Sequence, residues 1–159
     1  MLSNAGAGGW GLGAGKSGTW DLGLGAGNIL KFNVMEGVVK CYRDLIVWQH
    51  GIDLVEAIYS LSKSFPPAER YALCDQMHRA VISIPANIAE GHARSSSKEF
   101  LHYLSISLGS LAELETHLTI AHRLSYLGDE QFTAIFDRTG VLGKNLRSLQ
   151  KSMYNKVKQ

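Results

Sequence analysis

The chain has 159 residues and a formal net charge of +2, with 45% apolar and 19% charged residues. This length suits one domain, and the composition supplies enough apolar side chains for one core, which excludes a collagen, a disulfide scaffold and a wholly disordered chain. The charge is unevenly spread, because residues 138–159 contain six basic side chains and no acidic one. A basic terminal segment suits phosphate binding, but it is also typical of a solubilising helix end.

Residues 1–34 contain 10 of the 17 glycines. Gly15-Lys16-Ser17 resembles the end of a Walker A loop, but Trp10 stands where that loop needs a glycine. Two GxGxxG patterns lack the preceding strand that would give them meaning. We therefore predict a flexible Gly-rich segment at 1–34, dispensable for folding, followed by one domain at 35–159.

The two cysteines, Cys41 and Cys74, show no metal-ligand spacing. We expect two free thiols and a reducing, cytoplasmic location. No apolar run reaches the ~18 residues of a membrane-spanning helix.

The first predicted helix covers residues 44–64 and ends at the two prolines of Phe65-Pro66-Pro67. Its apolar side chains recur at spacings of three and four, which indicates one buried face. The predicted core stripe consists of Leu45, Trp48, Ile52, Val55, Ile58 and Tyr59.

The second predicted helix covers residues 68–90, with Gly91 as its stop. Pro85 lies inside it and is expected to kink it and to free the carbonyl of Val81, a backbone group that Asn87 could bond. The predicted core stripe consists of Leu73, Met77, Ala80, Val81, Ile84 and Ile88.

The third predicted helix covers residues 96–124 and opens with a capping box, in which Ser96 caps and Glu99 reaches back. The fourth begins near Asp129 and continues past Leu149. The predicted core stripes are Phe100, Leu104, Leu108, Leu111 and Leu118 in the third helix, and Phe132, Ile135, Phe136, Leu142, Leu146, Leu149 and Met153 in the fourth.

Four amphipathic helices joined by short loops predict an all-α fold, an antiparallel up-down-up-down four-helix bundle. Two helices carry bulky apolar side chains outside their stripes. These extra side chains indicate either a subunit interface or a broad core face, and the sequence does not decide between them. They are Ile46, Val47 and Leu54 in the first helix, and Leu101, Ile106 and Leu114 in the third.

Catalytic and metal motifs are missing from the sequence. It has no HExxH and no GxSxG, and the two candidate metal pairs, Glu99 with His102 and Asp75 with His78, lie off the apolar stripes. We therefore expect no metal, no cofactor and no enzymatic activity.

Dense, ordered motifs between Tyr42 and Leu127 resemble those of the small four-helix-bundle proteins of the 23S rRNA intervening-sequence family. The most telling is Ser-Ile-Pro-x-Asn-Ile-Ala-Glu-Gly at 83–91, and the others lie at 44–49, 65–80, 94–100 and 108–115. The resemblance implies a ring-shaped homopentamer. It also implies kinship with accessory proteins of diversity-generating retroelements, which bind nucleic acid and a reverse transcriptase.

Two functions remain open at this point. The first is a non-enzymatic homo-oligomer that binds RNA or DNA through basic side chains, with little sequence preference and a steep salt dependence. The second is a protein–protein scaffold or adaptor, for example for a reverse transcriptase, without nucleic-acid contact. The candidate nucleic-acid-binding residues are Arg79, Arg94, Lys98, Lys144, Arg147, Lys151, Lys156 and Lys158.

Overall fold

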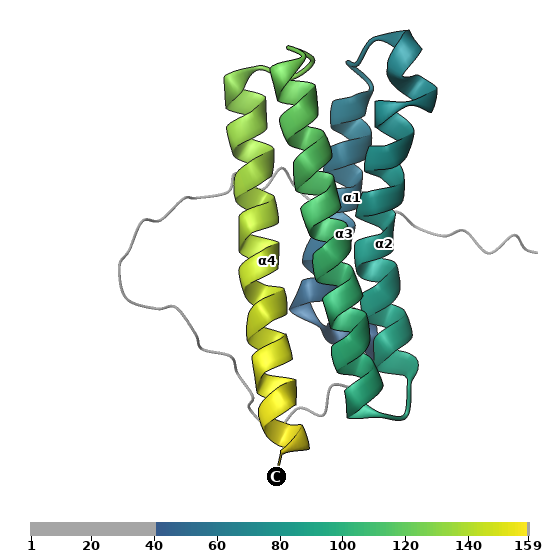
Figure 1. Cartoon of the computed structure of the whole chain (residues 1–159), viewed down its shortest axis with the longest axis vertical. Helices are drawn as coiled ribbons and strands as arrows, with labels where there is room; N and C mark the ends of the chain where they lie inside the picture. The colour runs from purple at the N-terminus through teal and green to yellow at the C-terminus, as the bar shows by residue number, and fades with distance from the viewer. Residues whose placement is uncertain (1–40, 159) are drawn as a thin grey trace, which may run out of the picture. The chain divides into compact units, whose positions relative to one another are not determined.

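A computed structural model describes residues 41–158 (Figure 1). Within this range the protein is all-α and contains no strand, so the prediction of four helices is confirmed. The predictions for residues 1–34 lie outside the described residues. The helices are α1 (Ile46–Ser62), α2 (Leu73–Ala93), α3 (Ser97–Arg123) and α4 (Asp129–Val157), with short 3-10 helices at Tyr42–Asp44 and Pro67–Tyr71.

The four helices pack around a closed circuit. Helix α2 contacts α1 and α3, and α4 contacts α3 and α1, whereas the diagonal pairs do not approach each other in the described part of the chain. Figure 1 shows the α1–α2 and α3–α4 connections at the top and the α2–α3 connection at the bottom. None of these helices is long and apolar enough to cross a membrane.

Helix α2 is the most deeply buried helix, and all six side chains of its predicted stripe lie in the core. The stripe of α3 is buried except for Leu108, which is half-buried. In α4 the stripe is buried at Ile135, Leu142 and Leu146, while Phe136 is 36% exposed.

The predicted stripe of α1 is only partly right. The face that enters the core carries Val47, Gly51, Leu54 and Ile58, of which only Ile58 belongs to the predicted stripe. Three more residues of that stripe are half-buried and pack against the core from its edge. At Gly51 a Cβ would lie 3.2 Å from Pro85 Cβ. Glycine permits this close approach of α1 and α2. The buried face therefore includes a glycine, which a search for apolar side chains at helical spacing overlooks.

The side chains outside the predicted stripes divide into three groups. Val47, Leu54 and Leu114 lie in the core, as a broad core face requires. Leu101 is half-buried. Ile46 and Ile106 are 46% and 37% exposed, so these two and the accessible part of Leu101 remain available for contact with another molecule.

Two predicted helix ends differ from the structure. Helix α2 runs through Gly91 to Ala93, and Gly91 is buried against α3, where a Cβ would lie 2.5 Å from Tyr103 Cβ. This glycine serves close packing rather than helix termination. At the start of α3, Ser96 is the N-cap as predicted, but its side chain accepts from the N–H of Lys98 at 3.3 Å. No hydrogen bond from Glu99 completes the box within the described residues.

Small polar side chains lie between α2 and α3. Ser107 Oγ donates to the carbonyl of Ile84 at 3.1 Å, and the hydroxyls of Ser83 and Ser110 are 2.8 Å apart. Asn87 Nδ2 donates to the carbonyl of Ser83 at 2.7 Å. The prediction that Asn87 bonds the carbonyl of Val81, which Pro85 leaves without a donor, is therefore wrong. These serines let two helices approach closely while their buried polar atoms stay hydrogen-bonded.

Candidate functional site

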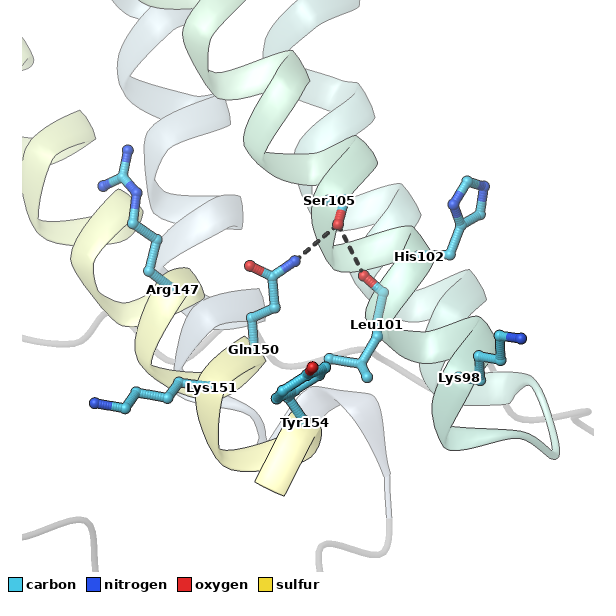
Figure 2. Close-up of a pocket in the computed structure, with 8 residues that line it drawn as sticks. All are labelled: Lys98, Leu101, His102, Ser105, Arg147, Gln150, Lys151 and Tyr154. Atoms are coloured by element: carbon cyan, nitrogen blue, oxygen red, sulfur yellow. Dashed lines mark hydrogen bonds between the residues drawn. The ribbon is translucent and has the colours of Figure 1, made fainter. Parts of the chain in front are cut away.

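A shallow groove between α3 and α4 brings three of the predicted basic residues together (Figure 2). Lys98 belongs to the first turn of α3, whereas Arg147 and Lys151 are one turn apart on α4. The lining residues are Lys98, Leu101, His102, Ser105, Arg147, Gln150, Lys151 and Tyr154.

The α4 side of the groove follows from helix periodicity. Leu142 and Leu146 point into the core, and the exposed Arg147 and Lys151 lie just beside that face. Gly143 is buried under the arginine, because a Cβ there would lie 3.2 Å from Arg147 Nη1 and 3.3 Å from Leu111 Cδ2. A glycine at this position therefore makes room both for the core leucine and for the long basic side chain.

A polar bridge joins α3 and α4 across the groove. Gln150 Nε2 donates to Ser105 Oγ at 2.7 Å, and Ser105 Oγ donates to the carbonyl of Leu101 at 3.1 Å. Figure 2 shows this bridge with Leu101 and Tyr154 beside it. Leu101 is half-buried, and Tyr154 is 51% exposed. The groove thus combines cations on both sides with an apolar and aromatic surface between them.

The groove cations are not neutralised by carboxylates. Among residues 41–158, none of the ion pairs within 4.0 Å includes Lys98, Arg147 or Lys151. The sequence also has no Asp or Glu after Asp137. Positive potential therefore accumulates along this part of α4.

The other predicted residues of α4 lie near the groove without lining it. Lys144 is exposed, one turn before Arg147. Lys156 and Lys158 are exposed at the end of the helix, and Lys158 Nζ lies 4.6 Å from the centre of the Tyr154 ring. This distance corresponds to a cation–π contact on the aromatic residue of the groove.

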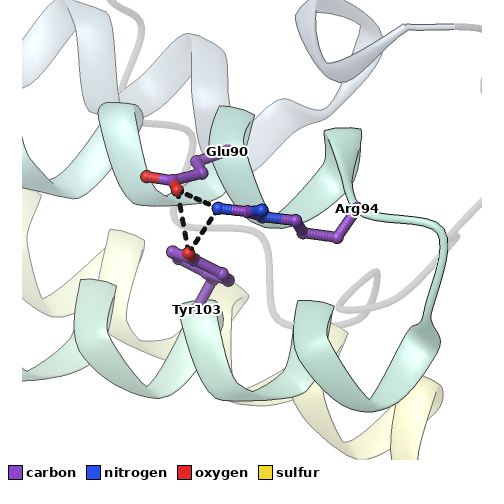
Figure 3. Close-up of polar contacts among 3 residues, drawn as sticks. All are labelled: Glu90, Arg94 and Tyr103. Atoms are coloured by element: carbon purple, nitrogen blue, oxygen red, sulfur yellow. Dashed lines mark hydrogen bonds and ion pairs between the residues drawn. The ribbon is translucent and has the colours of Figure 1, made fainter.

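Arg94 is engaged in a three-residue contact at the end of α2 (Figure 3). Its guanidinium bonds Glu90 and lies 2.9 Å from Tyr103 Oη, and that hydroxyl donates to Glu90 at 2.8 Å. The hydrogen bonds from Tyr103 and then Arg94 lower the pKa of Glu90, and the bond to Glu90 raises the pKa of Arg94. Both groups therefore stay charged, and the positive charge of Arg94 is balanced within the protein.

Arg79 is also paired, and it lies outside the groove. Its Nε is 3.6 Å from Asp75 Oδ2, four residues earlier on α2. Helix α2 is diagonal to α4 in the bundle, so the structure does not bring Arg79 to the α4 cations.

Five side chains that line the groove beside the cations were not among the predicted site residues: Leu101, His102, Ser105, Gln150 and Tyr154. The sequence did contain a signal for Tyr154, because positions 147, 151 and 154 have the spacing of one helical face. It contains no local signal for His102, which joins the groove only because α3 packs against α4.

Catalytic or metal-binding groups are sparse in the described part. No cluster of three or more metal-ligating side chains occurs within residues 41–158. Ser62 Oγ lies 2.8 Å from His78 Nε2, a pair sixteen residues apart that the sequence did not suggest, but the pair does not line the groove. Cys41 and Cys74 are free thiols, and burial, more than the nearby Glu69, raises the pKa of Cys74. A neutral, buried thiol is a poor nucleophile.

Comparisons with known proteins agree with the motif resemblance. A family model described as 23S rRNA-intervening sequence protein matches residues 43–148. A similar solved structure is that of a protein of unknown function from the S23 ribosomal protein family of Bacteroides thetaiotaomicron VPI-5482. The two are 27% identical with a TM-score of 0.63, over 67% of this chain and 99% of that chain. No curated protein matches the sequence at a significant level.

Proposed function

This chain belongs to the 23S rRNA-intervening sequence protein family, and from that premise we propose that it is a non-enzymatic, cytoplasmic homo-oligomer that binds RNA or DNA. The binding surface is the α3–α4 groove, with Lys98 on one side and Arg147 and Lys151 on the other. The helices of each subunit run up-down-up-down, and the subunits form a pentameric ring, as the family resemblance implies.

One observation carries this proposal: three cations line one groove without a carboxylate partner in the described residues. An unpaired cation on a protein surface attracts phosphate, and each phosphate that it neutralises releases a condensed counterion. Arg79 and Arg94 carry the same charge but are held by their own carboxylates. The groove therefore supports phosphate contact better than the α2 residues do.

Assembly multiplies a weak contact. One groove with three cations gives modest affinity, whereas several grooves on one assembly can engage the same strand at high effective concentration. The exposed Ile82 and Ile106 on α2 and α3 supply apolar surface for subunit contact.

The test compares two variants that lose equal charge. Lys98→Gln, Arg147→Gln and Lys151→Gln together remove the groove cations. Lys63→Gln, Arg70→Gln and Arg123→Gln remove three cations that are also exposed and also free of ion pairs within the described residues, but lie outside the groove. Fluorescence anisotropy with several unrelated RNA and DNA oligonucleotides then gives affinity over a salt series.

We expect the groove variant to bind all the oligonucleotides more weakly. Its slope of log affinity against log salt should be smaller by about 0.7–0.9 for each phosphate that the variant no longer neutralises. The control variant should keep a slope close to that of the wild type. If the wild type shows no salt-sensitive binding at low ionic strength, the proposal is wrong and a protein–protein adaptor, for example for a reverse transcriptase, becomes the better assignment.

A further inference from the structure

We infer that the α3–α4 groove takes single-stranded rather than double-stranded nucleic acid, with one base stacked on Tyr154. This inference rests on the proposed function, since it presupposes that Lys98, Arg147 and Lys151 bind phosphates. It goes further by naming the form of the nucleic acid and the aromatic residue that distinguishes it.

Tyr154 lies among the groove cations of α4. It follows Lys151 by three residues and Arg147 by seven, so all three share one face of the helix. Figure 2 shows the tyrosine ring at the foot of the groove, beside Leu101. A strand whose phosphates contact Arg147 and Lys151 therefore has an aromatic ring within reach of its bases.

The Tyr154 side chain lies outside the core and is free to take part in binding. It is 51% exposed, and its hydroxyl has no hydrogen-bond partner within residues 41–158. Lys158 Nζ lies 4.6 Å from the ring centre, so one cation already contacts the ring while about half of the side chain stays accessible. A half-exposed aromatic ring next to unpaired cations is the arrangement that proteins use to stack unpaired bases.

The lining of the groove matches a single strand better than a duplex. In a duplex the bases stack on one another, and the outer surface presents phosphates, sugars and base edges. A duplex would therefore use the cations but not the faces of Leu101 and Tyr154. A single strand presents base faces as well as phosphates, and so matches the whole lining of the groove.

The experiment separates base stacking from phosphate contact. The probes are a labelled oligo(dT), an oligo(U) of the same length, an abasic strand with the same number of phosphates, and a duplex of equal length. The proteins are the full chain, Tyr154→Ala and Tyr154→Phe. Because Tyr154 is half-exposed and outside the core, neither change should unfold the bundle, and thermal melting verifies this.

We expect Tyr154→Ala to weaken binding of oligo(dT) and oligo(U) by roughly 5- to 100-fold, the usual range for removal of one stacked base. Its salt slope should stay unchanged, because the variant keeps every cation that meets a phosphate. Binding of the abasic strand and the duplex should not change, and Tyr154→Phe should behave like the wild type. Equal weakening for the DNA and the RNA strand would show that the groove takes single strands of both kinds.

Three results would overturn the inference. They are an equal effect of Tyr154→Ala on the abasic strand, no effect of it on any probe, or a duplex that binds the wild type as tightly as the single strands do. In each case salt-sensitive binding that depends on Lys98, Arg147 and Lys151 would leave the proposed function standing. Absence of all binding by the wild type would remove both.

Discussion

Two helical glycines of this protein have opposite surroundings. At Gly91 a Cβ would lie 2.5 Å from Tyr103 Cβ and 3.0 Å from Phe100 Cδ2, whereas at Gly109 it would meet nothing within 4 Å. We predict that Gly91→Ala lowers the free energy of unfolding by about 1–3 kcal/mol, because α3 must shift away from α2 to admit the methyl group. Gly109→Ala should raise it by about 0.5–1 kcal/mol through helix propensity.

Denaturant titration at one fixed protein concentration compares the two variants, since assembly makes apparent stability depend on concentration. The nearest atom is Tyr103 Cβ, which moves only with the backbone of α3, and Phe100 is buried, so rotation of a ring cannot make room for the methyl group. A stable Gly91→Ala protein would show that α2 and α3 pack less closely than the structure has them.

His78 is the residue whose protonation should affect stability. It stacks on Tyr59 with ring centres 3.9 Å apart, bonds Ser62, and lies near Asp75 on its own helix. Burial lowers the pKa of His78 below its ordinary 6.5, and the opposing effect of Asp75 is smaller. The unfolded chain therefore binds this proton more readily than the folded one.

The effect of His78 is to make the folded protein less stable as the pH falls. The contribution of His78 to stability is fully present above pH 6.5 and is lost as the pH falls from there through the folded pKa. We predict that His78→Gln loses less stability than the wild type between about pH 7.5 and pH 5.5. Thermal melting over this range decides the matter, and parallel curves for the two proteins would contradict the prediction.

The contacts of a single residue can be predicted from the sequence where its partner lies one helical turn away. The pairs Arg79–Asp75 and Arg94–Glu90 both have the four-residue spacing that a helix brings together. Tyr103 joins Arg94 and Glu90 from another helix, and Gln150 reaches Ser105 across 45 residues. These contacts depend on how the helices pair, which no local pattern reveals.

At the scale of elements, periodicity predicted all four helices but only part of the buried face of α1. The predicted face is rich in large apolar side chains, whereas the buried face includes Gly51, which lies close to Pro85 of α2. Apolar side chains lie on two neighbouring faces of α1, and the face that is buried is the one whose glycine allows the backbones of α1 and α2 to come close. A pattern that weighs only side-chain hydrophobicity cannot make that choice.

The turn between α3 and α4 offers a test of one element boundary. Helix α3 ends in a Schellman motif, in which the N–H of Tyr126 bonds the carbonyl of Ala121 and the N–H of Ser125 bonds that of His122, both at 2.9 Å. Ser125 takes a positive φ of 61°, a conformation that costs a residue with a Cβ about 1–2 kcal/mol.

We predict that Ser125→Gly raises the free energy of unfolding by about 0.5–1 kcal/mol, after the greater freedom of glycine in the unfolded chain is subtracted. Ser125→Ala is the matched control, because it removes the hydroxyl but keeps the strained Cβ, and it should not stabilise the protein. Denaturant titration measures both. A gain for alanine equal to that for glycine would show that the hydroxyl, and not the backbone, limits stability here.

At the scale of the whole molecule, two exposed apolar residues are the surface where we expect copies of the proposed oligomer to meet. Ile82 and Ile106 are 45% and 37% exposed, and they lie close to the Ser83–Ser110 contact that joins α2 and α3. Neither contributes to the buried core. A surface of this kind is stabilised when a second subunit covers it.

We predict that the wild type is a homo-oligomer, a pentamer, in native mass spectrometry and light scattering. Ile82→Glu with Ile106→Glu should shift it to smaller species, because a covered carboxylate without a partner is costly. Tyr71→Glu with Leu124→Glu is the control, because the two substitutions add the same charge. Tyr71 and Leu124 are 87% and 51% exposed and lie at the end of the bundle where the α1–α2 and α3–α4 connections are. Both variants should keep the helical fold of the wild type, because all four side chains are exposed, whereas only the variant that dissociates should lose the apparent thermal stability that assembly adds. If only the control pair dissociates the oligomer, the interface lies at that end of the bundle instead. If the wild type stays monomeric at high concentration, there is no ring, and the groove cannot gain affinity from several copies on one assembly.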